Sequence, residues 1–331
     1  MFKRKINVAF TFDFRMWMIA GVCLHSLCSN ARGKCKYQIY CIVDAGVNSG
    51  MRQMLRDCIP SPHKIEFIEI KGDEIKHSDY WNRATSFQRS AMYRLLLPQV
   101  LPHLDKILYI DSDTIIAKDL CELDSIDIGD NLLGAVREFS IAETIRQKPE
   151  LFTHIKQYGI DKLVASARYF NSGVLIMNLK EFRRQNITHR ALHLFETGPG
   201  FWCCDQDTLN IICANKVTYI PFRFNRWGQL TGDYLFKFCH SHGLETKHAH
   251  SDVSDYTILH FVGTKPWTIE PPYAAPQEDV WWCYAARTPF YDRLKHLHRA
   301  VVEMEMQKRY QKAQAEATQK NKKTKKEEVN H

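Results

Sequence analysis

The sequence lacks the marks of several large classes of protein. No apolar stretch is long enough to span a bilayer, no segment repeats at a fixed period, and no Cys-x-x-Cys pair has the spacing of a zinc knuckle. The basic and then apolar start of the chain is similar to a secretion signal, but Asp13 and Arg15 interrupt its apolar part. We therefore expect neither a transmembrane protein, nor a repeat array, nor a secreted domain.

The cysteines show no pairing pattern. There are 11 of them, an odd number, scattered through segments of strand and helix character. Such cysteines are typical of reduced, mostly buried thiols, which indicates a cytoplasmic protein. The 331 residues are 45% hydrophobic and 12% aromatic, which is enough to bury one large core or two small ones.

The formal charge of +8 is unevenly distributed, because the segment 307–326 is rich in Lys, Gln and Ala and has almost no large apolar residues. This composition predicts a tail outside the core. Two interpretations stay open. The tail is attracted peripherally to the anionic inner face of the cytoplasmic membrane, or it is a solvated helix that frays. Nucleic acid is not expected, since Tyr310 is the tail's only aromatic residue.

Short apolar runs alternate with helix-like stretches in the first half of the chain, which predicts an α/β fold. The predicted strands are 6–12, 37–43, 64–70 and 106–110, followed in a more mixed second half by 132–136 and 169–177. The predicted helices are 15–29, 48–58, 86–101, 179–194 and 205–214. This order predicts a mostly parallel central sheet flanked by helices, with ligands at the carboxyl ends of its strands.

Two acids follow the strand 106–110 directly. Asp111 and Asp113 are two residues apart, so in extended chain their side chains leave on the same face and can converge on one cation. Carboxylate oxygens suit Mn²⁺ or Mg²⁺, and such a cation can hold a diphosphate. A polar strand end before a turn would show the same pair, so other segments must decide.

A second candidate ligand lies at the end of a later apolar run. His260 closes the run that starts at residue 258, and Gly263 and Lys265 follow it. The glycine would allow close backbone approach, and the lysine would supply positive charge to the same diphosphate. An imidazole ligand beside two carboxylates favours Mn²⁺, with Mg²⁺ as the alternative.

Two further motifs come between the acids and the histidine. Asn171-Ser172-Gly173 opens an apolar strand, and Asp205-Gln206-Asp207 opens a helix. From about residue 6 to about residue 291, the ordered combination resembles retaining glycosyltransferase family eight, to which glycogenin and bacterial lipopolysaccharide galactosyl- and glucosyltransferases belong. The resemblance implies the GT-A nucleotide-sugar-binding fold over residues 1–290, with a C-terminal helix and basic tail over 291–331.

The resemblance also implies roles for individual residues. It implies metal ligation by Asp111, Asp113 and His260, and catalytic roles for Gln206 and Asp205 beside the donor sugar. The donor-binding residues that it implies are Thr11, Asp13, Arg94, Asp111, Ser112, Asp113, Glu138, Asn171, Gly263 and Lys265. Simpler interpretations are a turn for Asp13, an internal acid paired with Arg94, and helix N-capping for Asp205 and Asp207.

The expected function is a metal-dependent retaining hexosyltransferase. It would move glucose or galactose from a UDP-hexose to a saccharide acceptor, lipid-linked and of the lipopolysaccharide or lipooligosaccharide type. Gln206 carries an amide, a poor nucleophile, so we favour attack from the face that the leaving phosphate departs from. The alternatives are a nucleotide-sugar hydrolase and a non-catalytic nucleotide-sugar-binding protein.

The segment 231–255 contains a second set of candidate metal ligands. Cys239, His240, His242, His248 and His250 have residue types and spacings that permit zinc. The segment is hydrophilic and lies between two motifs of the family, so we interpret it as a surface insertion near the acceptor side and do not expect zinc there.

Overall fold

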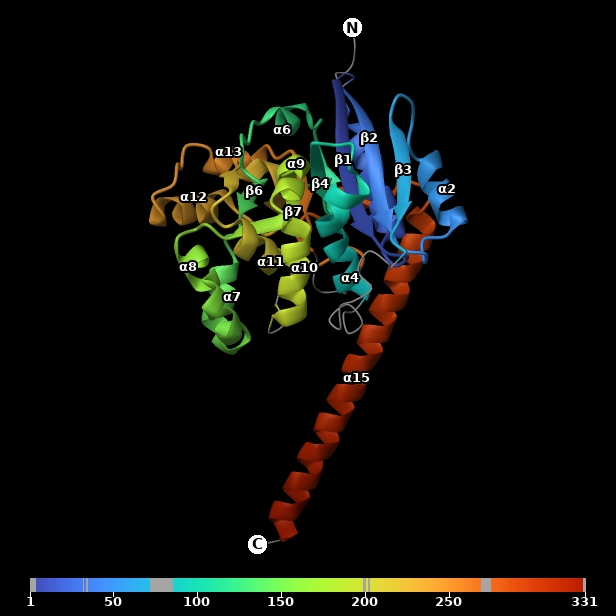
Figure 1. Ribbon diagram of the computed structural model, residues 1–331. Helices are drawn as coiled ribbons and strands as arrows, with labels where there is room; N and C mark the ends of the chain where they lie inside the picture. The colour runs from blue at the N-terminus through green and yellow to red at the C-terminus, as the bar shows by residue number, and fades with distance from the viewer. Residues whose placement is uncertain are drawn as a thin grey trace. The chain divides into compact units, whose positions relative to one another are not determined.

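A computed structural model describes residues 4–31, 33, 35–71, 86–198, 201, 203–268 and 275–329. The chain divides into two compact units, Met1–His260 and Phe261–His331 (Figure 1). The first unit contains all the described strands and most of the candidate site residues.

The main sheet of the first unit is mostly parallel, as predicted. The strands are β1 (Arg4–Phe12), β2 (Cys35–Val43), β3 (Lys64–Glu69), β4 (Lys106–Ile110), β5 (Thr114–Ile116), β6 (Leu133–Arg137), β7 (Phe170–Asn178), β8 (Val217–Tyr219), β9 (Arg226–Trp227) and β10 (Ile258–His260). The main sheet has the order β3-β2-β1-β4-β7-β6-β8, and a smaller sheet has the order β5-β10-β9. In the main sheet, β7 is antiparallel to its neighbours β4 and β6, whereas the other described pairs are parallel.

The direction of β7 determines what meets at the site. Parallel β1 and β4 bring their carboxyl ends to one edge of the sheet, whereas antiparallel β7 brings its first residues to that edge. The backbone N–H of Asp111 accordingly donates to the carbonyl of Gly173 at 2.8 Å. The motif that opens β7 therefore lies next to the acids that follow β4.

Helices cover the main sheet and complete the predicted α/β architecture. In the first unit they are α1 (Trp17–Ser29), α2 (Ser49–Asp57), α4 (Ser86–Met92), η1 (Tyr93–Leu96), α5 (Leu97–Val100), α6 (Cys121–Ser125), α7 (Ile141–Gln147), η2 (Pro149–Tyr158), α8 (Ile160–Ala165), α9 (Leu179–Arg184), α10 (Ile187–Thr197), α11 (Cys204–Cys213), η3 (Phe222–Phe224), α12 (Gly232–Ser241) and α13 (Ala249–Ser254). Apolar residues of α9, α10 and α11 join those of β4, β6 and β7 in one buried core. This core holds β4 and β7 in place from one side.

Two predicted helices are interrupted. The predicted helix 86–101 is α4, the 3₁₀ turn η1 and α5, and Pro98 lies at the start of α5, where its missing N–H is tolerated. The predicted helix 179–194 is divided into α9 and α10 at Asn186, whose φ of 53° is left-handed. Asparagine tolerates this conformation better than most residues, which explains the break.

The segment predicted as a surface insertion contains two helices, α12 and α13. Leu235 and Cys239 of α12 and Ala249 of α13 are buried, although most of their neighbours are exposed. The segment thus has a small apolar anchor of its own.

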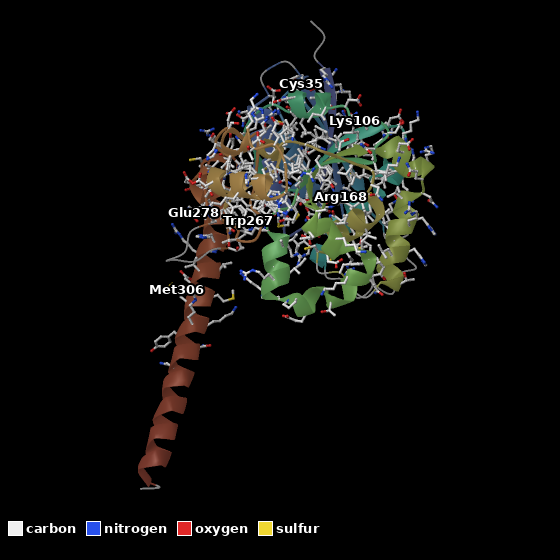
Figure 2. The ribbon with its side chains drawn as sticks, turned by 90° about the vertical axis from the view of Figure 1, so that its left-hand side faces the viewer. Cys35, Lys106, Arg168, Trp267, Glu278 and Met306 are labelled. Atoms are coloured by element: carbon white, nitrogen blue, oxygen red, sulfur yellow. The ribbon has the colours of Figure 1, made fainter. Side chains whose placement is uncertain are left out.

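The described part of the second unit contains two helices, joined to short non-helical segments. It contains α14 (Glu278–Ala285) and α15 (Tyr291–Val329), so the C-terminal extension is helical as expected. Trp267, labelled in Figure 2, packs on Trp281 with ring centroids 4.8 Å apart, and Trp281 contacts Trp282 at the same distance. Among the described residues, no helix has both the length and the apolar character that crossing a membrane requires.

Candidate active site

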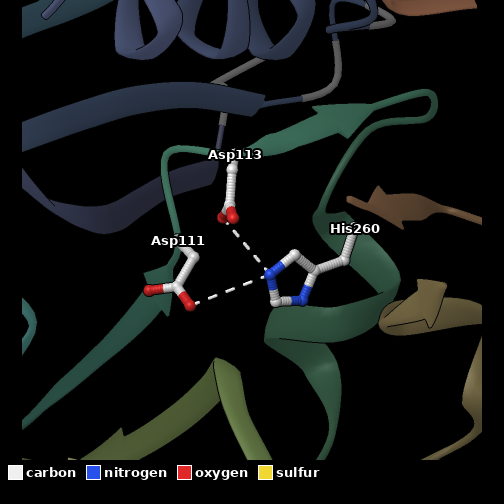
Figure 3. A group of neighbouring side chains, drawn as sticks. All are labelled: Asp111, Asp113 and His260. Carbon is white, nitrogen blue, oxygen red and sulfur yellow. Dashed lines mark ion pairs between the residues drawn. The ribbon is translucent and has the colours of Figure 1, made fainter. Parts of the chain in front are cut away.

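Asp111, Asp113 and His260 converge as the sequence predicts. Nε2 of His260 lies 3.2 Å from Oδ1 of Asp113 and 3.9 Å from Oδ2 of Asp111 (Figure 3). One ligand atom from each residue lies within 4.8 Å of the others, and within the described ranges no other group of three or more His, Cys, Asp or Glu does this. The smaller sheet explains the meeting, because antiparallel pairing of β10 with β5 sets His260 opposite Thr114.

The carboxylate of Asp111 is held so that its two oxygens have different surroundings. Oδ1 accepts hydrogen bonds from the Tyr109 hydroxyl at 2.6 Å and from Nη2 of Arg94 at 2.9 Å. Oδ2 is the oxygen that faces His260. Donors on one oxygen leave the other directed at the metal position, an arrangement that fixes ligating carboxylates.

Asn225 sets the orientation of the His260 ring. Its Oδ1 lies 2.9 Å from Nδ1 of His260, and its Nδ2 donates to Oδ1 of Asn171 at 2.8 Å. Because the amide oxygen of Asn225 can only accept, Nδ1 carries a proton, and Nε2 is the ring nitrogen that faces the acids. A metal-ligating histidine needs this tautomer.

The same network continues to Glu138. Asn171 donates from Nδ2 to Oε2 of Glu138 at 3.2 Å and accepts from the backbone N–H of Gly173 at 2.9 Å. Ser140 donates to Oε1 of Glu138 from both its N–H and its hydroxyl. Burial raises the pKa of Glu138.

Gly173 leaves room for the His260 ring and the Asp111 carboxylate. A Cβ at this position would lie 2.3 Å from Cε1 and 2.8 Å from Nδ1 of His260, and 2.9 Å from Oδ2 of Asp111. No side chain fits there without displacing these groups. The glycine is therefore required by the close approach of the His260 ring and the Asp111 carboxylate.

Arg94 pairs with two acids across the site. Its guanidinium is buried, lies 2.9 Å from Asp111 and 3.1 Å from Asp205, and packs over the Tyr109 ring. It also donates to the carbonyl of Ser172 at 2.6 Å. The internal acids that could satisfy this arginine are thus members of the predicted site.

Asp205 does not cap α11 as the simpler interpretation would have it. Its Oδ2 accepts from the Ser172 hydroxyl at 3.0 Å and faces Nε of Arg94. Burial raises the pKa of Asp205 to about 6, an increase that the Arg94 guanidinium opposes. This carboxylate is costly to ionise in the free enzyme.

Stability should therefore depend on pH through Asp205. Its folded pKa of about 6 exceeds the ordinary 3.8, so its contribution to the free energy of unfolding is full below 3.8 and is lost as the pH rises through 6. Asp205→Asn lacks this loss. With a chelator present, the free energy of unfolding of the variant relative to that of the wild type should therefore increase by about 1 kcal/mol from pH 5 to pH 7. Denaturant unfolding at both pH values measures the change. A difference between the two proteins that stays constant with pH would contradict the raised pKa.

Gln206 is fixed at both ends of its amide. Its Oε1 accepts from the backbone N–H of Ser172 at 2.9 Å, and its Nε2 donates to the Tyr169 hydroxyl at 3.3 Å. That hydroxyl in turn donates to Asp207 at 2.6 Å. Asp207 also accepts from the N–H of Cys203, so it serves the start of α11 as predicted.

Several other predicted donor contacts line one pocket. Thr11 and Ser112 border it together with Arg94, Asp111 and Asp113. The Ser112 hydroxyl donates to the carbonyl of Thr11 at 3.2 Å, which joins the end of β1 to the acid pair.

Asp13 is not among the residues that line this pocket. Its buried carboxylate accepts from the N–H of Arg15 at 2.9 Å and from the Arg15 guanidinium, as a turn residue would. Gly263 and Lys265 belong to the second unit, where Gly263 has a φ of 77° and Lys265 donates to the carbonyl of Phe261 at 2.5 Å. Donor binding by these three residues stays a prediction.

The rival cysteine and histidine cluster does not form a metal-binding group among the described residues. Cys239 is buried, Nδ1 of His242 lies 2.8 Å from the carbonyl of Phe238, and Nε2 of His250 lies 3.0 Å from Asp233. The expectation that zinc is not bound there stays a prediction.

Two residues that orient the candidate ligands were not predicted from the sequence. Tyr109 reads as one more buried strand residue, and Asn225 lies in a short irregular segment before β9. The parallel pairing of β9 with β10 sets Trp227 opposite His260 and brings Asn225 within reach of the ring. Only knowledge of this pairing would have identified Asn225.

Comparison with known proteins agrees with the geometry. The sequence profile described as "Glycosyl transferase family 8" matches residues 7–270. General stress protein A of Bacillus subtilis is 24% identical over 80% of this chain and 87% of its own length. Lipopolysaccharide 1,2-glucosyltransferase of Escherichia coli is 23% identical over 79% of this chain and 72% of its own. The galactosyltransferase LgtC, solved with donor and acceptor sugar analogs, superposes with a TM-score of 0.64 at 21% identity over 86% of this chain and 96% of its own, which supports the GT-A-like fold.

Proposed function

The chain belongs to glycosyltransferase family 8, and from this premise we propose that it is a metal-dependent retaining hexosyltransferase with a UDP-glucose or UDP-galactose donor. The observation that carries the proposal is the convergence of two carboxylates and one imidazole at the carboxyl end of β4. Ligands of open α/β sheets bind at such strand ends.

The residues present fit a divalent cation. Two acids and an imidazole nitrogen form the donor set, and Gly173 lets the His260 ring lie close to Asp111. We propose Mn²⁺, with Mg²⁺ as the alternative, because oxygen ligands suit both ions and the imidazole favours the former. When bound, the cation would neutralise the charge that grows on the departing diphosphate.

The protein's own groups would hold the donor sugar from several sides. We propose that Arg94 contacts the sugar and diphosphate, that Glu138 and Asn171 contact the sugar's hydroxyls, and that Asp205 and Gln206 face the reacting carbon. Because the Gln206 amide is fixed by Ser172 and Tyr169, it can stabilise positive charge on the sugar without reorganising.

Retention of configuration at the anomeric carbon would follow if the acceptor attacks from the face of the donor sugar that the phosphate leaves. The bond from the anomeric carbon to the phosphate oxygen breaks, the acceptor hydroxyl oxygen bonds to that carbon, and its proton passes to the departing phosphate. No enzyme nucleophile is needed, so an amide at residue 206 suits this route.

The acceptor is proposed to be a saccharide of the lipopolysaccharide or lipooligosaccharide type, linked to lipid. A relative named as a lipopolysaccharide 1,2-glucosyltransferase supports this choice. The enzyme would then act in the cytoplasm, on the inner face of the cytoplasmic membrane, and the absence of disulfide bonds among the described cysteines agrees with that compartment.

A donor screen tests the function. UDP release is followed with Mn²⁺ for each nucleotide sugar, with and without a saccharide extract as acceptor. Acceptor-stimulated release from UDP-glucose or UDP-galactose is expected. Equal release without acceptor would identify a hydrolase, and binding without any release would identify a nucleotide-sugar-binding protein.

The basic tail should bring the enzyme to anionic lipid. Its backbone is helical through Val329, while the side chains of 315–329 lie outside the described ones. Each basic residue near such a surface contributes on the order of 1 kcal/mol, and salt screens the attraction over roughly 8 Å. Full-length protein should therefore sediment with anionic vesicles at low salt but not at high salt.

Removal of 307–331 should abolish this sedimentation while transfer to a short soluble acceptor stays unchanged. Transfer to a lipid-linked acceptor in vesicles should fall. A variant with Gln at Lys320, Lys322, Lys323, Lys325 and Lys326 keeps the tail's length and should behave like the truncation. Equal lipid binding by all three proteins would show that the tail has no such role.

A further inference from the structure

A second pocket opens beside Glu138, and its volume is about 430 Å³. Residues of three helices line it together with the two residues that follow β6. They are Glu138 and Phe139, Ala142 and Arg146 of α7, Val164 of α8, and Tyr234, Lys237, Phe238, Ser241 and His242 of α12 and its end. A space of this size accommodates one or two sugar rings.

This pocket is connected to the metal position by hydrogen bonds. His260 contacts Asn225 at 2.9 Å, Asn225 donates to Asn171 at 2.8 Å, and Asn171 donates to Glu138 at 3.2 Å. Glu138 is therefore both the last member of that network and part of the lining. The pocket begins where the proposed donor-sugar site ends.

Aromatic rings form one wall. The Phe139 ring packs against Trp227 with centroids 4.3 Å apart, against Tyr234 at 5.6 Å and against Phe238 at 6.3 Å. Tyr234 is 46% exposed, so part of this cluster faces solvent. Aromatic faces pack well on the C–H faces of pyranose rings, because both surfaces are apolar and flat.

Two basic side chains, Arg146 and Lys237, lie at the rim with the imidazole of His242. All three residues are exposed. The acid of the lining, Glu138, is buried, and its Oε1 accepts hydrogen bonds from Ser140 while its Oε2 accepts one from Asn171. A ligand in the pocket thus meets positive charge at the rim and an aromatic surface within.

We propose that this pocket binds an anionic sugar of the acceptor, one that carries a phosphate or a carboxylate. Guanidinium and ammonium groups recognise both anions, and the aromatic wall selects a sugar over a bare ion. The role of this sugar as the acceptor rests on the proposed transferase function, whereas its binding to the pocket does not require turnover. The two claims can therefore fail separately.

Calorimetric titration tests the binding directly. The protein is saturated with UDP and Mn²⁺, so that phosphate groups cannot enter the donor site, and is titrated with glucose 6-phosphate, glucuronic acid, glucose and inorganic phosphate. At least one of the two anionic sugars should bind about tenfold or more tightly than both glucose and inorganic phosphate. Which of the two binds distinguishes phosphate from carboxylate. The proposal would be overturned if neither anionic sugar binds more tightly than glucose, or if inorganic phosphate binds as tightly as both anionic sugars.

Variants locate the site. Arg146→Gln with Lys237→Gln should reduce the preference for the anionic sugar about tenfold or more, while affinity for UDP stays the same. Lys162→Gln on α8 is the matched control, because Lys162 is exposed and lies outside the lining. Full preference in the double variant, or an equal loss in the control, would refute the assignment. Absence of UDP release in the donor screen, with this binding intact, would instead refute the transferase.

Discussion

Asp111→Asn and Asp113→Asn should each reduce transfer by about a hundredfold to a thousandfold, since a metal ligand stabilises the leaving group by several kcal/mol. Each change removes one anionic oxygen from the group at the end of β4 and keeps the size of the side chain. Both side chains are partly exposed, so the fold should persist. Activity at saturating donor, with Mn²⁺ titrated from limiting concentrations, measures the effect.

Asp105→Asn is the matched control for these variants. Asp105 precedes the same strand at its other end, is 77% exposed and pairs with Arg183 at 3.3 Å. Removal of the Asp105 charge should leave transfer within about twofold of wild type, because exposed ion pairs contribute little to stability. Full turnover by either site variant at limiting Mn²⁺, in protein with a native circular-dichroism spectrum, would overturn the metal assignment.

Gly173→Ala should abolish Mn²⁺ binding and destabilise the protein. Its methyl carbon would lie 2.3 Å from the His260 ring and 2.9 Å from Asp111, so both groups must shift in a packed interior. We expect a loss of about 1–3 kcal/mol in the free energy of unfolding and no measurable transfer. Denaturant unfolding and Mn²⁺ titration by electron paramagnetic resonance measure the two effects.

Two comparisons show whether the clash is the cause. Gly50→Ala in α2 adds the same methyl group where the nearest atom is 3.4 Å away, and helix propensity should make it neutral or slightly stabilising. Adding His260→Ala to Gly173→Ala removes the ring that the methyl group strikes, so stability should recover while metal binding does not. Unchanged Mn²⁺ affinity in Gly173→Ala would show that the space is not the metal position.

The candidate ligands could be predicted from the sequence because they lie in local patterns or in motifs of the family. The alternation of Asp111 and Asp113 after an apolar run gives their common face, and the resemblance supplied His260 from far along the chain. Asn225 and Tyr109 could not be found this way, since their roles depend on which strands become neighbours. The same limit applies to β7, whose antiparallel direction leaves no mark in its own residues.

Fold prediction failed where single residues decide a boundary. The apolar pattern favours one continuous helix over 86–101 and another over 179–194, but the first is divided just before Pro98 and the second at Asn186. The apolar periodicity continues across both breaks, so the pattern gives the number of helical turns better than it gives their division. The pocket beside Glu138 was also invisible, because it depends on α7, α8 and α12 meeting at one place.

The late position of β10 has a consequence for synthesis on the ribosome. The acids follow β4, but the imidazole that completes their group and the strand that presents it come about 150 residues later, which at roughly 5–20 residues per second is a delay of about 7–30 seconds. During that interval the nascent chain can form β1 to β4 and still have no complete metal site. A product of translation that stops before β10 would therefore carry the acids without the imidazole that completes their group.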